Sequence, residues 1–184
     1  AAPNGAAPVA SARLSFHAKE TEQYHICLGG AGIPRGDERR FALAVLDAVF
    51  GGGSSSRLFQ EVREKRGLAY SVYSWASQYM DTGQVGIYVG TRADNVAAAM
   101  EIVAGELEKI RTPIPGDELR RACEQVKGRM ALSMESTRAR MTRLGSSTLM
   151  GVPLLSLDET FERIDAITTA DLEALAGELY DPVR

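Results

Sequence analysis

Apolar and polar residues alternate with a period of two in three segments of the chain, residues 10–18, 22–29 and 82–91. This period is typical of strands with one buried face. A fourth strand is expected at about 69–79, next to 82–91. Polar residues at 19–21 and 81–83 have the composition of turns, so we expect each neighbouring pair of segments to form an antiparallel hairpin.

Helical spacing of apolar residues replaces this alternation between the two strand pairs. It predicts a helix over 37–50 whose first turn contains Asp37 and Glu38, where acidic side chains suit the helix dipole. Three glycines, residues 51–53, end this helix. A shorter helix then begins, capped by Ser54 or Ser55, and ends at Gly67.

The pattern is helical from Asp94 to the end of the chain, over about five helices. Strands close in sequence favour antiparallel pairing. We therefore predict an α+β fold, with one largely antiparallel sheet and the 37–50 and 94–134 helices packed on one of its faces. The apolar stripes predict that the following side chains are buried: Leu14, Phe16, Ile26, Val45, Val103 and Val126.

The composition is ordinary for a globular protein, with 45% hydrophobic and 24% charged residues in a chain of 184. Small residues at 1–10 are typical of a linker and do not form a signal peptide, so we expect a fragment in which residues 11–184 form a single domain. A net charge of −3 gives no reason to expect nucleic acid as a partner. No apolar run approaches the ~20 residues of a membrane span, which predicts a soluble protein. The compartment stays open, with the cytoplasm favoured.

Few residues offer catalytic or metal-binding chemistry. Cys27 and Cys123 are too few for a disulfide framework or a metal cluster, and we expect both to be buried. His17 begins a sequence that imitates the inverted zinc motif His-x-x-Glu-His, but the fifth position is Thr21 and the segment is predicted to be a strand. We therefore expect no metal and no cofactor in this chain.

The glycine-serine run at 51–57 also imitates a phosphate-binding loop. A Walker loop follows a strand and contains lysine, whereas this run follows a predicted helix and has none. It is better interpreted as a tight link between two helices, or as a loop that packs beside a peptide cleft.

Residues 51–75 read GGGSSSRLFQEVREKRGLAYSVYSW. This sequence resembles a signature in the C-terminal half of the insulinase/pitrilysin zinc peptidases, a family that includes the mitochondrial processing peptidase. In that signature a Gly/Ser loop leads into Ser-Arg-Leu-Phe, then Val-Arg-Glu-Lys-x-Gly-Leu-Ala-Tyr, then a strand. A looser similarity covers about Glu22 to Arg184.

The resemblance implies the substrate-binding, non-zinc half of a metallopeptidase whose two halves close around a peptide. Zinc and His-x-x-Glu-His would belong to the N-terminal half, on the same polypeptide or in a companion subunit, so this chain alone should be inactive. The family's C-terminal half supplies an arginine and, seven positions later, a tyrosine, which Arg63 and Tyr70 match. Both would contact substrate and stabilise negative charge on the reacting carbonyl. Tyr73 and Trp75, on the opposite face of the strand from Tyr70, are expected to be packing residues.

Two other interpretations stay open. One is a non-catalytic member of the same family that acts as a scaffold or binding subunit, as the core proteins of the respiratory complex do. The other is a stand-alone module unrelated to proteolysis. A homo-oligomer is compatible with all of them. The short Gly/Ser loop favours the catalytic type over the family's α-type processing subunit, in which this loop is extended. The sequence upstream of Ala1 would decide, because His-x-x-Glu-His there favours the peptidase.

Overall fold

The computed structural model describes residues 15, 17 and 21–181, and its sheet has three strands. They are β1 (Tyr24–Gly32), β2 (Ala69–Gln78) and β3 (Gly83–Thr91), in the order β1-β3-β2. Both pairings are antiparallel. The central strand is therefore β3, and β1 and β2 are the edges of the described sheet.

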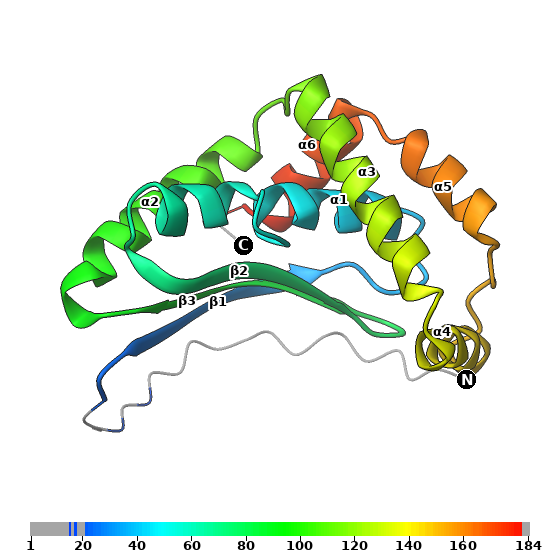
Figure 1. Cartoon of the computed structure of the whole chain (residues 1–184), viewed down its shortest axis with the longest axis horizontal. Coiled ribbons are helices and arrows are strands. Elements are labelled where there is room, and N and C mark those ends of the chain that lie inside the picture. The colour runs from blue at the N-terminus through cyan, green and yellow to red at the C-terminus, as the bar shows by residue number, and fades with distance from the viewer. Residues whose placement is uncertain (1–14, 16, 18–20, 182–184) are drawn as a thin grey trace.

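Helices cover one face of this sheet (Figure 1). Helices α1, α2 and α6 contact the strands, whereas α3 and α5 pack against α1, and α4 lies beyond one end of the sheet. The helical segments are α1 (Arg40–Phe50), the π-helix η1 (Phe59–Glu64), the 3₁₀-helix η2 (Ala93–Asn95), α2 (Val96–Ile110), α3 (Gly116–Ser133), α4 (Thr137–Leu149), α5 (Leu157–Asp165) and α6 (Thr169–Leu179). This arrangement confirms the predicted α+β fold with helices on one face. Within the described residues, no helix is both long enough and apolar enough to cross a membrane.

The core fills the space between the sheet and the helices. Its largest fully buried side chains include Phe50 and Leu46 of α1 and Leu172 of α6, each of which contributes about 1.5–3 kcal/mol by leaving water. Burial is confirmed for Val45, Val103 and Val126. Ile26 is only half-buried, because it lies on the edge strand β1. The other two predicted positions, Leu14 and Phe16, lie outside the described residues.

The predicted first hairpin is not the pairing that β1 makes. This strand pairs along its whole length with β3, from Tyr24 opposite Thr91 to Gly32 opposite Gly83. Of the predicted strand 10–18, the structure describes Ser15 and His17, and neither is in a strand. Proximity in sequence favoured the hairpin, but an apolar face can be buried equally well by a distant partner.

Two helix starts also differ from the sequence prediction. Helix α1 begins at Arg40 and not at residue 37, because the Asp37 carboxylate accepts hydrogen bonds from the backbone N–H and the guanidinium of Arg39 in a preceding turn. Neither Ser54 nor Ser55 caps the next helix. The Ser55 hydroxyl instead donates to Gln125 of α3 (Oγ–Oε1 3.1 Å).

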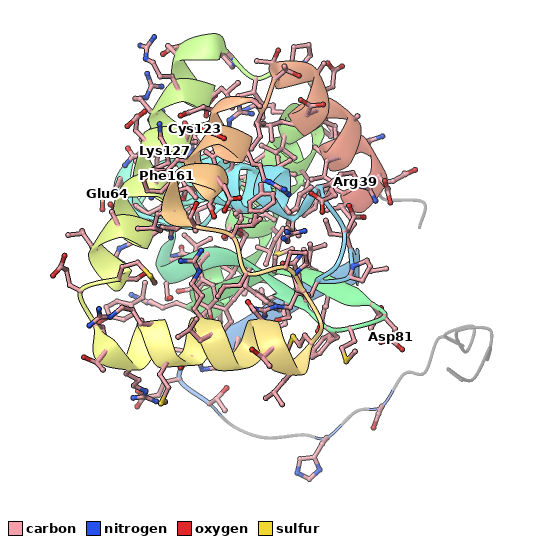
Figure 2. All side chains as sticks on the ribbon, turned by 90° about the vertical axis from the view of Figure 1, so that its right-hand side faces the viewer. Arg39, Glu64, Asp81, Cys123, Lys127 and Phe161 are labelled. Atoms are coloured by element: carbon pink, nitrogen blue, oxygen red, sulfur yellow. The ribbon has the colours of Figure 1, made fainter. Side chains whose placement is uncertain are left out.

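Ion pairs tie α5 to α3, and the turn before α1 to α6. Lys127 of α3 reaches Asp165 of α5 (Nζ–Oδ1 2.7 Å), and Arg39 reaches Glu178 of α6 (Nη1–Oε2 2.5 Å). Figure 2 shows Lys127 and Cys123 together on the side of α3 that lies near α5. Cys123 is buried as expected, but Cys27 is exposed, because it lies on the sheet face opposite the helices.

Replacing Gly51 by alanine is expected to destabilise the fold by at least about 2 kcal/mol. A Cβ atom at Gly51 would lie 2.3 Å from the backbone nitrogen of Ser74, and neither main chain can retreat in a close-packed interior. Gly128→Ala is the control, because its Cβ meets no atom within 4 Å in the middle of α3 and should stabilise by about 0.5–1 kcal/mol. Urea unfolding of both variants measures the difference. Equal stabilities for the two variants would contradict the tight contact of Gly51 with β2.

Candidate functional site

The segment that follows the glycines is anchored by three of its side chains. The side chains of Leu58 and Val62 point into the core and are fully buried. The guanidinium of Arg57 binds the carboxylate of Glu118 on α3 through two hydrogen bonds (Nε–Oε1 2.8 Å and Nη2–Oε2 2.6 Å), and this interaction raises the pKa of Arg57. A bidentate pair of this kind fixes orientation as well as position. The segment therefore holds Arg63 on a well-supported element.

Arg63 differs from its basic neighbours in having no carboxylate partner in the described part of the chain. Lys65 and Arg66 both bind Glu61, with N–O distances of 2.5 Å. These contacts lower the pKa of the Glu61 carboxyl, with the Lys65 hydrogen bond as the larger cause. Among the described residues, no hydrogen-bond acceptor or carboxylate engages the Arg63 guanidinium. Its five N–H donors are free to bind a ligand.

Two aromatic rings hold this free guanidinium in place. Its carbon Cζ lies 4.9 Å from the centre of the Phe59 ring and 5.7 Å from the centre of the Tyr70 ring. Both distances fall within the range of cation–π attraction, which contributes about 0.5–1 kcal/mol at exposed sites. The structure thus brings Arg63 and Tyr70 together, as the family signature implies.

Tyr70 is positioned by an irregularity at the start of β2. Gly67, with φ at +61°, ends the preceding helical segment and turns the chain into the strand. Pairing with β3 then skips one residue, because Ala69 lies opposite Thr91 whereas Ser71 lies opposite Gly90. Tyr70 is the extra residue of this β-bulge. Its side chain is 78% exposed, and no described residue bonds to its hydroxyl.

The glycine loop is tied to the middle of β2. The backbone N–H of Ser74 donates to the carbonyl of Gly51 (3.2 Å), and the Ser74 hydroxyl donates to the half-buried carboxyl of Asp47 (2.6 Å). Burial raises the pKa of Asp47, and the hydrogen bond from Ser74 offsets part of that rise. From α3, Arg129 donates to the carbonyl of Gly52 (3.1 Å). These hydrogen bonds hold the loop in a fixed position beside β2.

A hollow of about 520 Å³ lies between this loop, η1 and β2. Arg63, Phe59, Tyr73 and Trp75 contribute to its lining, together with Asp47 and parts of the 51–54 and 71–76 segments. A volume of this size suits a binding site for a small group. Tyr70 does not line the hollow, although its ring contacts Arg63 at the rim.

The positions of Tyr73 and Trp75 agree with one part of the sequence prediction and correct another. Both are packing residues, as expected, because Tyr73 stacks on Tyr88 and Trp75 lies against Gly86. They also line the same hollow as Arg63, although we expected them to face away from it. The prediction assigned Tyr73 and Trp75 to a face by counting alternate residues from Tyr70. The bulge at Tyr70 breaks this alternation. The hollow also follows the edge of β2, so side chains from both faces can border it. The sequence did contain a signal for this aromatic surface, because Tyr70, Tyr73 and Trp75 lie within six positions of one another.

The described residues do not form a zinc site. No group of three or more histidine, cysteine, aspartate or glutamate side chains in that part of the chain could hold a metal ion. The groups that surround Arg63 and Tyr70 include a guanidinium, a phenol and aromatic rings, which are not the Cys, His or carboxylate ligands that zinc takes. Their chemistry suits hydrogen-bond donation to oxygen atoms of a ligand.

Comparison with known proteins identifies the family of this chain. The protein-family model of the peptidase M16 inactive domain matches residues 3–126 of this chain. An uncharacterized zinc protease of Streptomyces coelicolor is 43% identical over 92% of this chain and 37% of its own length. The uncharacterized zinc protease YmxG of Bacillus subtilis is 44% identical over 88% of this chain and 40% of its own length. This chain thus spans about two-fifths of these relatives.

A solved structure supports the same assignment. It is the peptidase M16 inactive domain from Pseudomonas fluorescens, which is 26% identical and superimposes with a TM-score of 0.75. The match covers 86% of this chain and 38% of that one. The signature sequence, the one-sided α+β fold and these matches together show that the chain belongs to the M16 zinc protease family, as its inactive, C-terminal-type domain.

Proposed function

We propose that this chain is the substrate-binding, non-zinc half of a zinc metallopeptidase, and that Arg63 and Tyr70 complete an active site in the other half. The observation that carries the proposal is the free guanidinium of Arg63, held between the rings of Phe59 and Tyr70 at the rim of the hollow. Lys65 and Arg66 on this segment are neutralised by Glu61, whereas no hydrogen-bond acceptor in the described part of the chain occupies the donors of Arg63.

Each residue has a distinct role in this proposal. The guanidinium of Arg63 donates to carbonyl oxygens of the bound peptide and positions it. The phenol of Tyr70 donates to the carbonyl oxygen that gains negative charge during hydrolysis. Zinc, bound by the companion half, would supply the hydrolytic chemistry. We call the pair of halves, joined in one polypeptide or as two subunits, the assembled peptidase.

Photo-labelling tests the proposal of substrate binding directly. A peptide substrate that carries a photo-activatable phenylalanine analogue is irradiated with the assembled peptidase, and the labelled residues are identified by mass spectrometry. Labels within residues 59–76 are expected, because η1 and β2 carry the proposed contacts. Labels confined to α3, α5 or α6 would reject the site. Helices α3 and α5 lie on the side of α1 that faces away from the sheet, and α6 lies near β1, the opposite edge of the sheet from β2 (Figure 1).

This chain alone is expected neither to retain zinc nor to cleave peptides. Its described residues lack a metal-binding cluster, and its two histidines are not at the spacing of zinc ligands on a helix. The measurement is metal analysis after dialysis against a weak chelator, combined with a peptide hydrolysis assay. Retention of about one zinc ion per chain would contradict the assignment.

A further inference from the structure

A second cavity, of about 580 Å³, lies beyond the end of β2 that is farther from Arg63. Four elements border it: the loop between β1 and α1, the end of α3, one face of α4 and the start of α5. The loop is fixed there by its Arg35, whose backbone N–H donates to the carbonyl of Tyr79 (2.8 Å), just after β2. Figure 2 shows α4, in yellow, across the lower end of α3. The cavity shares no lining residue with the hollow beside Arg63, so it is a separate feature of the molecule.

The charge of this cavity is entirely positive. Arg35, Arg138 and Arg143 line it, and no aspartate or glutamate does so. The segment 136–157, which contributes most of α4, contains no acidic residue, and the acidic residues on either side of it do not line the cavity. We call this cavity the arginine pocket. Like charges gathered around one pocket repel one another, and an anion bound between them relieves that repulsion.

The arginines of the pocket differ from basic residues elsewhere on the outer helices. Arg121 and Lys127 of α3 and Arg163 of α5 each bind a carboxylate. Within the described residues, by contrast, no carboxylate or hydrogen-bond acceptor engages the guanidinium of Arg35 or Arg138. Their N–H donors are therefore available to a ligand.

The third arginine is held in place by its own hydrogen bonds. The guanidinium of Arg143 donates to the carbonyl of Leu155 and to the sulfur of Met134 (Nη1–Sδ 3.6 Å). Arg143 and Arg35 are both half-buried, which restricts the directions in which their side chains can point. Donors that are fixed before a ligand arrives lose little conformational entropy when they bind it.

The other groups of the lining suit the body of an anionic ligand. Thr142 and Ser146 follow Arg138 at successive turns of α4, so their hydroxyls lie on the same helix face as its side chain. Met130 and Met134 of α3 add an apolar surface that adapts to the shape of a ligand. A planar guanidinium matches two oxygens of a phosphate or carboxylate at once. Three guanidiniums favour the doubly charged phosphate over a single carboxylate.

We propose that the arginine pocket binds a phosphate group, either as inorganic phosphate or as part of a small phosphate ester. Arg35 and Arg138 donate to its oxygens, and the methionines contact any organic group attached to it. The bound anion joins the loop before α1 to α4, a helix in which no side chain is buried. It therefore holds α4 against the rest of the domain. This site goes beyond the proposed function and does not depend on it.

Isothermal titration calorimetry measures this binding on the whole chain. Inorganic phosphate and phenyl phosphate are titrated separately, at constant pH and constant total ionic strength. Saturable binding with a Kd in the millimolar range or below is expected for at least one of them. Tighter binding of phenyl phosphate supports the site with an ester as its ligand, because the methionines then contact the ring. Equal affinities support the site with the free ion as its ligand. No saturable binding of either would overturn the inference.

Single substitutions locate the site within the basic surface of α4. Arg35→Ala and Arg138→Ala should each weaken phosphate binding by about 10–100-fold, the effect of losing hydrogen bonds to a charged group. Arg140→Ala is the matched control, because Arg140 is an exposed arginine of the same helix that does not line the pocket. Arg138 is also exposed, so its replacement should not disturb the fold, and circular dichroism checks all three variants. An equal loss of affinity in Arg138→Ala and Arg140→Ala would refute the pocket in favour of general charge attraction.

Amide hydrogen exchange tests where the anion binds and what it does to α4. Phosphate should slow exchange in residues 130–146 of the wild-type chain, because it joins α4 to the loop before α1. The same concentration should have little effect on these residues in Arg138→Ala. Phosphate binding that leaves exchange in 130–146 unchanged would place the anion elsewhere and refute the inference.

Discussion

Tyr70→Phe is expected to lower kcat of the assembled peptidase by about 10²–10³-fold. The substitution removes one hydroxyl, and loss of a single donor to a developing oxyanion has an effect of this size. The fold should not change measurably, because the side chain is 78% exposed and its hydroxyl bonds to no described residue. Exposed substitutions of this kind usually stay within about 0.5 kcal/mol. Steady-state kinetics on a peptide substrate, with zinc content and unfolding midpoint measured in parallel, test the expectation.

Tyr79→Phe is the control for this variant. Tyr79 is 53% exposed and follows the end of β2, away from Arg63 and the hollow. It should retain full activity. If Tyr70→Phe retained the wild-type kcat, Tyr70 would have no catalytic role, whether or not Arg63 has one.

Arg63→Ala is expected to reduce kcat/KM of the assembled peptidase by about 10–100-fold, mainly through a higher KM. Hydrogen bonds to a charged group contribute about 1.5–3 kcal/mol each, and their loss removes peptide positioning rather than zinc chemistry. Arg63→Lys should recover only part of the loss, because an ammonium lacks the planar fork of donors. Stability should change little, since the guanidinium contacts rings and no carboxylate in the described structure.

Arg66→Ala is the matched control for Arg63. The two arginines are three positions apart, but Arg66 is bound to the backbone carbonyl and the carboxylate of Glu61. Its removal should leave KM near the wild-type value. If Arg66→Ala and Arg63→Ala raise KM equally, a general loss of positive charge explains both, and the specific role of Arg63 is wrong.

The sequence predicted the elements of the fold because each has a strong local pattern. The stripe of α1 and the alternation of β3 both mark a buried face, and these elements were found near their predicted positions. The partner of β1 was not predictable in the same way. Its pairing with β3 is decided by contacts between residues about 60 positions apart, to which no local pattern refers.

The site was predicted only where a residue-by-residue signature existed. Arg63 and Tyr70 were assigned from the resemblance, and the structure adds that Arg63 lacks a carboxylate partner in the described chain and lies between two rings. Neither the π-helical turns of η1 nor the bulge at Tyr70 has a pattern in the sequence. Both change the direction of nearby side chains, and the misassignment of Tyr73 follows from the bulge.

The central claim is that this chain completes the active site of the zinc-bearing half, and complementation between the two halves tests it most directly. The zinc-bearing half is produced alone, and its peptide turnover is measured as this chain is added. We predict that turnover rises saturably with the wild-type chain and stays near its starting value with the Arg63→Ala/Tyr70→Phe chain, at unchanged zinc content. Full turnover by the zinc-bearing half alone, unaffected by either chain, would contradict the account.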